Sequence, residues 1–266
     1  MAIQARAVVI AAALGPKLVG IGGKLLKSVK AVKAGLAGLS VVAYSWLFSW
    51  EFAAVLLVSL VIHEYGHVWA MRAVGIPTRG FYLIPFVGGA AVPERAFASR
   101  LEELFVALAG PTFGLAQAAL LYALYVAYGH PLLGAAAGWV AVLNLVNMIP
   151  ITPLDGGRIV KCATMSIGSR TGMVMLLASI LFAVLGMIAL RSWMIGIVAL
   201  FSLFEFLFER RTHRFTPDPY RKRMTAGQTV GGLVSYAVVT TALAMVVQGC
   251  LAIPEVMLAM SILRDG

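Results

Sequence analysis

Two histidines and a glutamate lie within five consecutive residues, His63-Glu64-Tyr65-Gly66-His67, inside a long apolar run. Residues four apart share one face of an α-helix, so His63 and His67 can hold one metal ion together. Glu64 can reach a water molecule on that ion as a general base. Ionisable side chains are costly inside a membrane helix, which makes all three functional candidates. The structural alternative is a pair of histidines that only hydrogen-bond within a helix bundle.

A third ligand is expected far along the chain, because catalytic zinc usually has three protein ligands and one open position. No Glu or His follows shortly downstream on the same run, and the candidate is Asp155. A carboxylate oxygen suits zinc. We expect Asp155 to end a helix at the depth where His67 ends its own. The surrounding sequence is Asn147-Met-Ile-Pro150-Ile-Thr-Pro153-Leu-Asp155-Gly156-Gly157, whose prolines break a helix and whose glycines allow close backbone approach. A plain helix-end carboxylate in a turn is the alternative.

The composition places these residues in a membrane. Of the 266 residues, 61% are hydrophobic and 12% are charged, and the mean hydropathy is +0.93. Soluble domains have about 25% charged residues. Several runs approach or exceed the roughly 18 apolar residues of a spanning helix, and they are too continuous for barrel strands. We therefore predict an all-α integral membrane protein, a polytopic bundle of about six to seven spans.

The runs predict where these spans lie. We expect a short first span over 36–50, a break at Trp50-Glu51 and a second span over 52–72. Residues 73–101 are rich in Gly and Pro, and their apolar stretch 81–87 is too short to span. It could form a re-entrant, β-like hairpin whose edge pairs with an extended peptide, or a surface loop at the interface. Later spans are expected over 103–128, 132–153, 172–190, 193–208 and 226–249.

Charge predicts orientation and partners. The net charge is +10, and 19 of the 21 Lys and Arg residues fall on one side of the expected topology. By the positive-inside rule, the N-terminus and the active site face the cytosol, in what we expect to be a bacterial inner membrane. Anionic lipid headgroups, rather than nucleic acid, are the expected partner of this charge.

Four segments are predicted from the same pattern. Residues 1–35 form a basic amphipathic segment on the membrane surface, or else a basic tail. Residues 36–208 form the core, with the catalytic helices over about 52–165. Residues 209–225 form a basic cytosolic loop, and residues 226–266 form a last span and tail.

Together the two motifs resemble the site-2 protease family of intramembrane zinc metalloproteases. A third family feature lies between them, Ala109-Gly110-Pro111-Thr112-Phe113-Gly114, where Gly114 stands at a position that is commonly Asn. The resemblance covers about residues 50–165. It implies a three-helix catalytic core in which Gly110 and Gly114 let helices pack closely.

The resemblance also implies a role for each site residue. His63, His67 and Asp155 would bind one Zn²⁺ per chain, Glu64 would activate the water, and Asn147 would position the substrate or stabilise the oxyanion. The reaction would be hydrolysis of a peptide bond in or near the transmembrane segment of a membrane protein. No stretch here is long enough for the PDZ or CBS domain of many relatives, so we expect a compact form.

Two other functions stay open at this point. One is a catalytically inactive relative that binds membrane proteins, against which the intact Glu64 argues. The other is a metal transporter. Glu205 and Gln117 are further polar residues within expected spans, but they form no ligand cluster in the sequence. The substrate, the cleavage position and the oligomeric state do not follow from the sequence.

Overall fold

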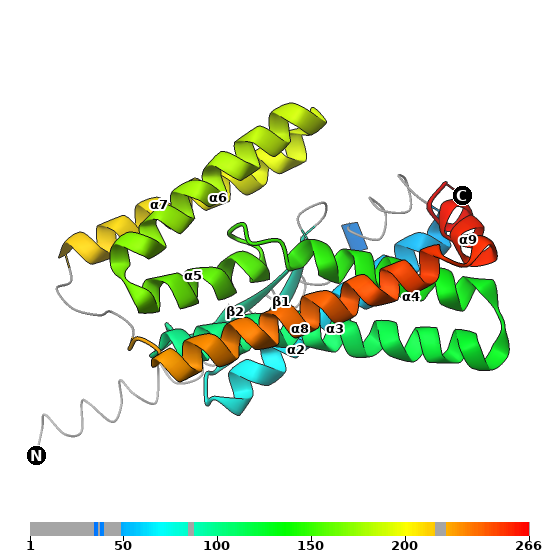
Figure 1. Ribbon diagram of the computed structural model, residues 1–266, viewed down its shortest axis with the longest axis horizontal. Helices are drawn as coiled ribbons and strands as arrows, with labels where there is room; N and C mark the ends of the chain where they lie inside the picture. Colours follow the sequence, from blue (N-terminus) through cyan, green and yellow to red (C-terminus); the bar gives the residue numbers. More distant parts are fainter. Residues whose placement is uncertain (1–34, 37, 40–48, 85–87, 216–221, 266) are drawn as a thin grey trace, which may run out of the picture.

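The computed structural model describes residues 35–36, 38–39, 49–84, 88–215 and 222–265 (Figure 1). The expected first span over 36–50 and the basic segment 1–35 lie largely outside these residues. So does part of the basic loop 209–225.

The described chain is mostly helical, as predicted. Four of its helices are long and apolar enough to cross a membrane, namely α2, α3, α6 and α8, and α4 is a shorter apolar helix. The helices are α2 (Trp50–Ala73), α3 (Arg100–Tyr128), α4 (Pro131–Asn147), α5 (Asp155–Ile167), α6 (Ser169–Leu190), α7 (Trp193–Phe215), α8 (Ala226–Leu251) and α9 (Pro254–Asp265).

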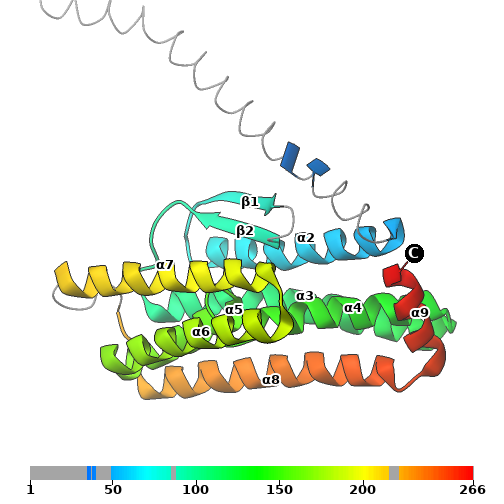
Figure 2. The same ribbon diagram turned by 90° about the horizontal axis from the view of Figure 1, so that it is seen from above.

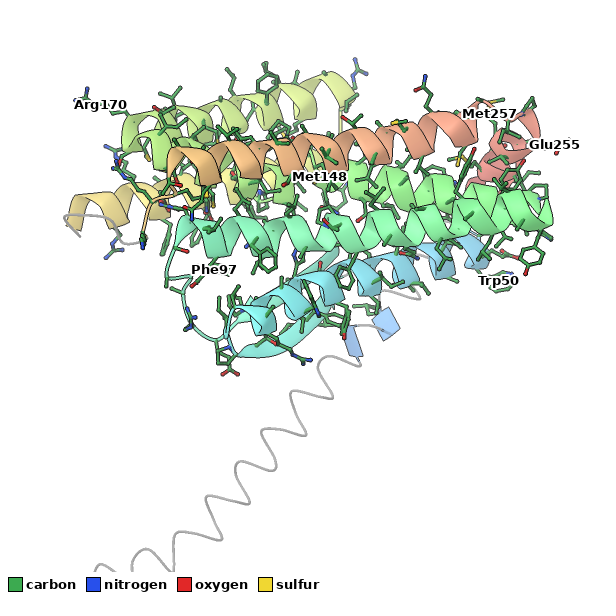
Figure 3. All side chains as sticks on the ribbon, turned by 60° about the horizontal axis from the view of Figure 1, so that its bottom comes forward. Trp50, Phe97, Met148, Arg170, Glu255 and Met257 are labelled. Atoms are coloured by element: carbon green, nitrogen blue, oxygen red, sulfur yellow. The ribbon has the colours of Figure 1, made fainter. Side chains whose placement is uncertain are left out.

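Four of the helices form a bundle and two form an attached hairpin. α2, α3, α4 and α8 run side by side, with α2 packed on α3 and α4, and α4 packed on α8 (Figures 1 and 2). α6 and α7 pair with each other, and α6 packs on α5. Trp50 and Arg170 lie at opposite ends of the molecule, with Met148 between them (Figure 3). The short helix α5 thus links the hairpin to the bundle.

α2 begins at the predicted break. The side-chain oxygen of Ser49 accepts a hydrogen bond of 3.2 Å from the backbone N–H of Phe52, and Glu51 lies in the first turn. A serine cap satisfies a free backbone donor, and an acidic residue complements the positive end of the helix dipole. These two residues start a helix here without Gly or Pro.

Two strands on either side of residues 85–87 pair with each other and lie along α2 (Figure 2). β1 (Thr78–Ile84) pairs antiparallel with β2 (Gly88–Pro93), so that Tyr82 lies opposite Ala90. The structure therefore shows paired strands in the described part of this stretch, as the β-like hairpin predicts. Its insertion into the membrane and its pairing with a substrate remain predictions.

The expected fourth span over 132–153 is too long. α4 ends at Asn147, and Asp155 opens α5 instead of ending α4. Pro150 and Pro153 cannot donate backbone hydrogen bonds, so the helix stops and a turn follows. A Cβ atom at Gly156 would overlap the carbonyl of Met148, so the turn folds directly onto the start of α5.

A buried ionic cluster joins α3, α5 and α7. Lys161 Nζ lies 2.9 Å from Glu103 Oε1 and 2.5 Å from Glu205 Oε1, and the Lys161 side chain is 2% exposed. Nearby, Arg100 of α3 pairs with Glu209 of α7. Burial opposes the charge on Lys161, but the carboxylates of Glu103 and Glu205 raise its pKa above the ordinary value. Glu205 is therefore an ion-pair partner within the described fold.

This cluster predicts the effect of removing its central charge. Lys161→Met keeps the length of the side chain but takes the ammonium from between two carboxylates. Breaking a buried ion pair costs about 3 kcal/mol, and we expect a loss of that order in the free energy of unfolding in detergent. Lys161→Met combined with Glu103→Gln should recover part of the loss. Equal stability of Lys161→Met and the wild type would contradict the role of the cluster.

Candidate metal site

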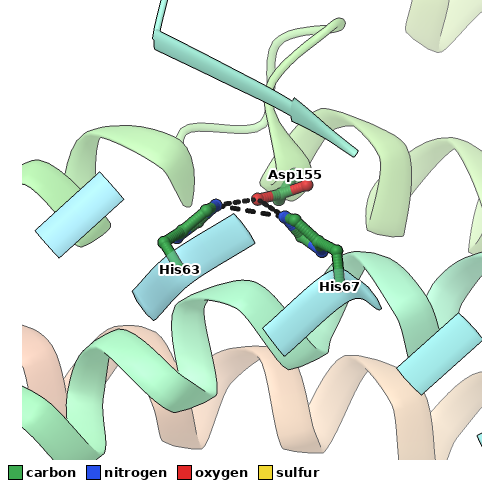
Figure 4. Close-up of side chains that lie close together, drawn as sticks. All are labelled: His63, His67 and Asp155. Atoms are coloured by element: carbon green, nitrogen blue, oxygen red, sulfur yellow. Dashed lines mark hydrogen bonds and ion pairs between the residues drawn. The ribbon is translucent and has the colours of Figure 1, made fainter. Parts of the chain in front are cut away.

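Three donor atoms from two distant segments meet at one point (Figure 4). Nε2 of His63 lies 3.1 Å from Nε2 of His67. Oδ2 of Asp155 lies 3.0 Å from the first and 3.2 Å from the second. The histidines extend from one face of α2, as the spacing predicts, and Asp155 comes from the first turn of α5. Among the described residues these three form a group able to hold a metal ion.

The remaining ring nitrogens of both histidines have partners. Nδ1 of His67 donates to the backbone oxygen of Val106, at 2.7 Å. Nδ1 of His63 lies 2.8 Å from Oδ1 of Asn144. A hydrogen bond at Nδ1 leaves the lone pair of Nε2 for a metal, which is the usual arrangement around ligating histidines. Both Nε2 atoms point at Asp155.

The second oxygen of Asp155 faces a cation. Oδ1 of Asp155 lies 3.4 Å from Nη1 of Arg158, one turn further along α5. Burial alone would raise the pKa of Asp155, and the neighbouring His67 and His63 lower it. Oδ2 of Asp155 faces the histidines, and Oδ1 faces the arginine.

The separations between donor atoms fit zinc. Tetrahedral ligands at about 2.0–2.2 Å from Zn²⁺ lie about 3.4 Å apart. The observed separations of 3.0 to 3.2 Å are close to that value. Two imidazole nitrogens with one carboxylate oxygen are a known ligand set of catalytic zinc, with the fourth position open.

Glu64 lies in the same cavity without serving as a fourth member of the ligand group. The cavity has a volume of about 420 Å³ and is lined by His63, Glu64, His67, Asp155 and Asn147 among others. Glu64 is 4% exposed, and its Oε2 has no hydrogen-bond partner among the described residues. A buried carboxylate oxygen without a partner requires an explanation. A water molecule in the cavity would supply one.

The other predicted residues take distinct positions. Asn147 lines the cavity, and its Nδ2 donates only weakly to the backbone oxygen of Leu143, at 3.4 Å. A Cβ atom at Gly110 would overlap the ring of His67 and approach Nε2 of His63 to 2.9 Å. Gly110 therefore makes room for the ligands themselves, beyond the helix packing that the sequence suggested.

Asn144 was not predicted as part of the site. It reaches His63, whereas only Asn147 was selected from the sequence. The one available signal was a second amide one turn before Asn147 on an apolar helix, where a buried polar side chain needs a partner.

Parts of the chain are also similar to known proteins. Residues 51–137 match peptidase family M50. Over that stretch the chain is similar to this family, in agreement with the resemblance inferred from the motifs. Zinc is the cofactor that the family and the donor set assign to the site.

Several relatives carry the same designation. Rip3 of Mycobacterium tuberculosis carries the name of a zinc metalloprotease. It is 32% identical to this chain over 134 residues, which are 47% of this chain and 34% of Rip3. A zinc metalloprotease of Methanocaldococcus jannaschii is 28% identical over 166 residues, 57% of this chain and 48% of that protein. The chain thus spans between a third and a half of the length of these relatives. A solved site-2 protease from the same archaeon is 25% identical, covers 70% of this chain and 88% of its own, and has a TM-score of 0.45.

The position of Gly110 predicts a steric effect on metal binding. In Gly110→Ala the new methyl group must displace the imidazole of His67, so we expect zinc affinity about tenfold or more below that of the wild type. Gly231→Ala on α8 is the matched control, because a Cβ atom there meets nothing within 4 Å. Competition with a chromophoric chelator measures both. Unchanged zinc affinity in Gly110→Ala would contradict the inference that Gly110 makes room for the histidine ligands.

Proposed function

We propose that the chain is a zinc-dependent intramembrane endopeptidase that hydrolyses a peptide bond in or near the transmembrane segment of a membrane protein. The observation that carries the proposal is one cavity that holds three convergent metal donors together with a partnerless carboxylate oxygen of Glu64. A metal site alone would suit several functions. The adjacent base favours hydrolysis.

In the proposed reaction, Glu64 moves the protons. When bound, zinc lowers the pKa of a water molecule toward about 7 and polarises the substrate carbonyl. Oε2 of Glu64 accepts a proton from the attacking water while the water oxygen bonds to the carbonyl carbon of the substrate. Glu64 then donates that proton to the amide nitrogen as the C–N bond breaks, which releases an amine and a carboxylic acid. His63, His67 and Asp155 are the ligands in this proposal.

Asn147 is placed to act on the substrate. Its side chain lines the cavity and its only described hydrogen bond is weak, so Nδ2 can turn toward the carbonyl oxygen of the scissile bond. A donor aimed at the developing oxyanion stabilises the transition state. We assign Asn147 this positioning role.

The hairpin gives the substrate a place to unfold. Gly89, Ala90 and Ala91 of β2 line the cavity, and the peptide bonds of a transmembrane helix are hidden in its own hydrogen bonds. An extended segment that adds to the edge of the hairpin would exchange those bonds for pairing with the sheet. β2 therefore supports a substrate held as a strand beside Glu64.

The proposed setting is a multi-pass bundle of six to seven spans with the N-terminus in the cytosol. The excess of Lys and Arg on one side supports this orientation and contact with anionic headgroups. Cleavage would then occur toward the cytosolic side, as in regulated intramembrane proteolysis.

Two alternatives have less support. A transporter needs a polar route through the bundle, but Glu205 is paired with Lys161 and neither it nor Gln117 joins a ligand group among the described residues. A non-catalytic binding protein would leave the position of Glu64 unexplained. Zinc flux into vesicles tests the first alternative, and the cleavage assay below tests the second.

Glu64→Gln separates catalysis from metal binding. The amide keeps the shape of the side chain but cannot accept the proton, so we expect full zinc content and a loss of about 10²–10⁴ in cleavage rate. The assay uses vesicles with single-span substrates that carry Gly or Pro within the span. Asp155→Ala is the companion variant, expected to lose both zinc and cleavage. Cleavage by Glu64→Gln at the wild-type rate would refute the assignment of the base.

Strand pairing is tested by proline on β2. Backbone N–H groups of successive residues point to opposite edges of a strand, so only one of Ala90→Pro and Ala91→Pro removes a donor from the free edge. That variant should keep its zinc and lose most of its cleavage, whereas the other disturbs the hairpin itself. A proline at Gly89 is less informative, because a Cβ atom there would overlap Glu64. Normal turnover in both variants would exclude the pairing.

A further inference from the structure

The side chain of Asn144 is held in one orientation. It lies on α4 and is 1% exposed. Its Nδ2 donates to the backbone oxygen of Val140 at 2.8 Å, one turn earlier on the same helix. A carbonyl oxygen can only accept, so it selects the NH₂ group of the amide. The Oδ1 atom of Asn144 is therefore the one that faces Nδ1 of His63, at 2.8 Å.

This orientation determines the tautomer of His63. An amide oxygen accepts but cannot donate, so Nδ1 of His63 must carry the hydrogen. The lone pair of the neutral ring then lies on Nε2, which faces His67 and Asp155. The reversed amide would place NH₂ against Nδ1 and favour hydrogen on Nε2, and a protonated Nε2 cannot bind a metal.

The amide fits only because residue 114 has no side chain. A Cβ atom on Gly114 of α3 would overlap Oδ1, Cγ and Nδ2 of Asn144. The glycine thus leaves a recess on α3 that the amide of α4 fills. Two helices together provide one hydrogen-bond acceptor at a fixed place beside His63.

We propose that Asn144, seated in the recess over Gly114, is a positioning residue that fixes His63 in its metal-binding tautomer and thereby sets the zinc affinity of the site. The inference rests on the metal site of the proposed function and goes beyond its ligands. It makes Gly114 part of the metal site through Asn144, although glycine has no group to bind a metal.

The experiment measures the affinity of the purified full chain for Zn²⁺ in detergent, by competition with a chromophoric chelator. Asn144→Leu is close in volume but has no acceptor, and we expect zinc affinity about 10–100-fold weaker. Asn144→Asp keeps an acceptor oxygen toward His63 in either protonation state, so we expect affinity close to that of the wild type. Rescue by aspartate but not by leucine separates positioning from simple filling of space.

Gly114→Ala tests the recess without altering Asn144. The methyl group must expel the amide from its place, so we expect a loss similar to that in Asn144→Leu. In an Asn144→Ala background the space is already vacant, and adding Gly114→Ala should cost little more. Such non-additivity is the signature of two residues that act through one contact. Additive losses would contradict the shared recess.

Gln117→Leu is the matched control. It also replaces an amide by leucine within the bundle, one turn beyond Gly114 on α3, but Oε1 of Gln117 has no hydrogen-bond partner among the described residues. Its zinc affinity should equal that of the wild type. The visible spectrum of the Co²⁺-loaded protein gives a second readout, which should change in Asn144→Leu and stay the same in Gln117→Leu.

The possible results distinguish the two proposals. Wild-type protein that binds no Zn²⁺ would overturn the metal site, and the inference with it. Tight binding by the wild type and equally tight binding by folded Asn144→Leu and Gly114→Ala would overturn the inference alone. Weak binding by both variants, with rescue in Asn144→Asp, supports it. If Asn144→Leu does not fold, Gly114→Ala and its double variant decide the question.

Discussion

Two imidazole rings inside an apolar helix need a partner for every nitrogen, and this requirement organises the fold around α2. A buried polar group without a hydrogen bond costs free energy, most of all where lipid replaces water. Three other elements meet the two rings. α3 places the Val106 carbonyl at Nδ1 of His67, and α4 places the Asn144 amide oxygen at Nδ1 of His63. α5 places Oδ2 of Asp155 beside both Nε2 atoms, where a shared metal ion would join all three. The bundle and the metal site are thus one structure, because the groups that meet the histidines also bring the helices together.

Glycines, which have no side chain, are as important to this arrangement as the polar groups are. Association of helices in lipid depends on close packing, which small residues permit. At Gly66 a Cβ atom would lie 2.7 Å from the Ala109 carbonyl, so α2 and α3 are in near backbone contact. Gly110 then accommodates the imidazoles and Gly114 accommodates the Asn144 amide, while Gly89 brings β2 against Glu64. Each of these glycines leaves space for a different chemical group of the site. The small residues Gly110 and Gly114 on α3 therefore determine which side chains pack against α3, as well as how closely the neighbouring helices approach it.

The sequence predicted the parts of this site that depend on local pattern. The i, i+4 spacing of His63 and His67, the adjacent Glu64 and the break before α2 follow from short stretches, and the structure places them as expected. The sequence also selected Asp155, whose Oδ2 lies beside both histidines, and its role as a metal ligand stays a prediction. Its predicted place at the end of α4 was wrong, because two prolines end α4 earlier than its hydropathy suggests. α5 lies between the expected spans over 132–153 and 172–190, so the hydropathy pattern did not predict this helix. Its burial depends on Glu103 and Glu205, which come from helices far away in the sequence. The role of Asn144 likewise depends on a contact across 81 residues, which no local pattern contains.

α5 carries the third ligand, so the precision of the site depends on what holds this helix of 13 residues. One anchor is the ionic cluster, in which Lys161 joins Glu103 of the bundle to Glu205 of α7. Another is the hydroxyl of Ser202 on α7, which donates to the backbone oxygen of Thr152 in the turn just before Asp155. A buried ion pair adds little net stability compared with apolar packing, but it is specific in geometry, because the charges must meet. Apolar packing alone would let α5 slide or turn between the bundle and the α6–α7 hairpin. A lysine held between carboxylates on either side restricts both motions, and the position of Oδ2 of Asp155 is restricted with them.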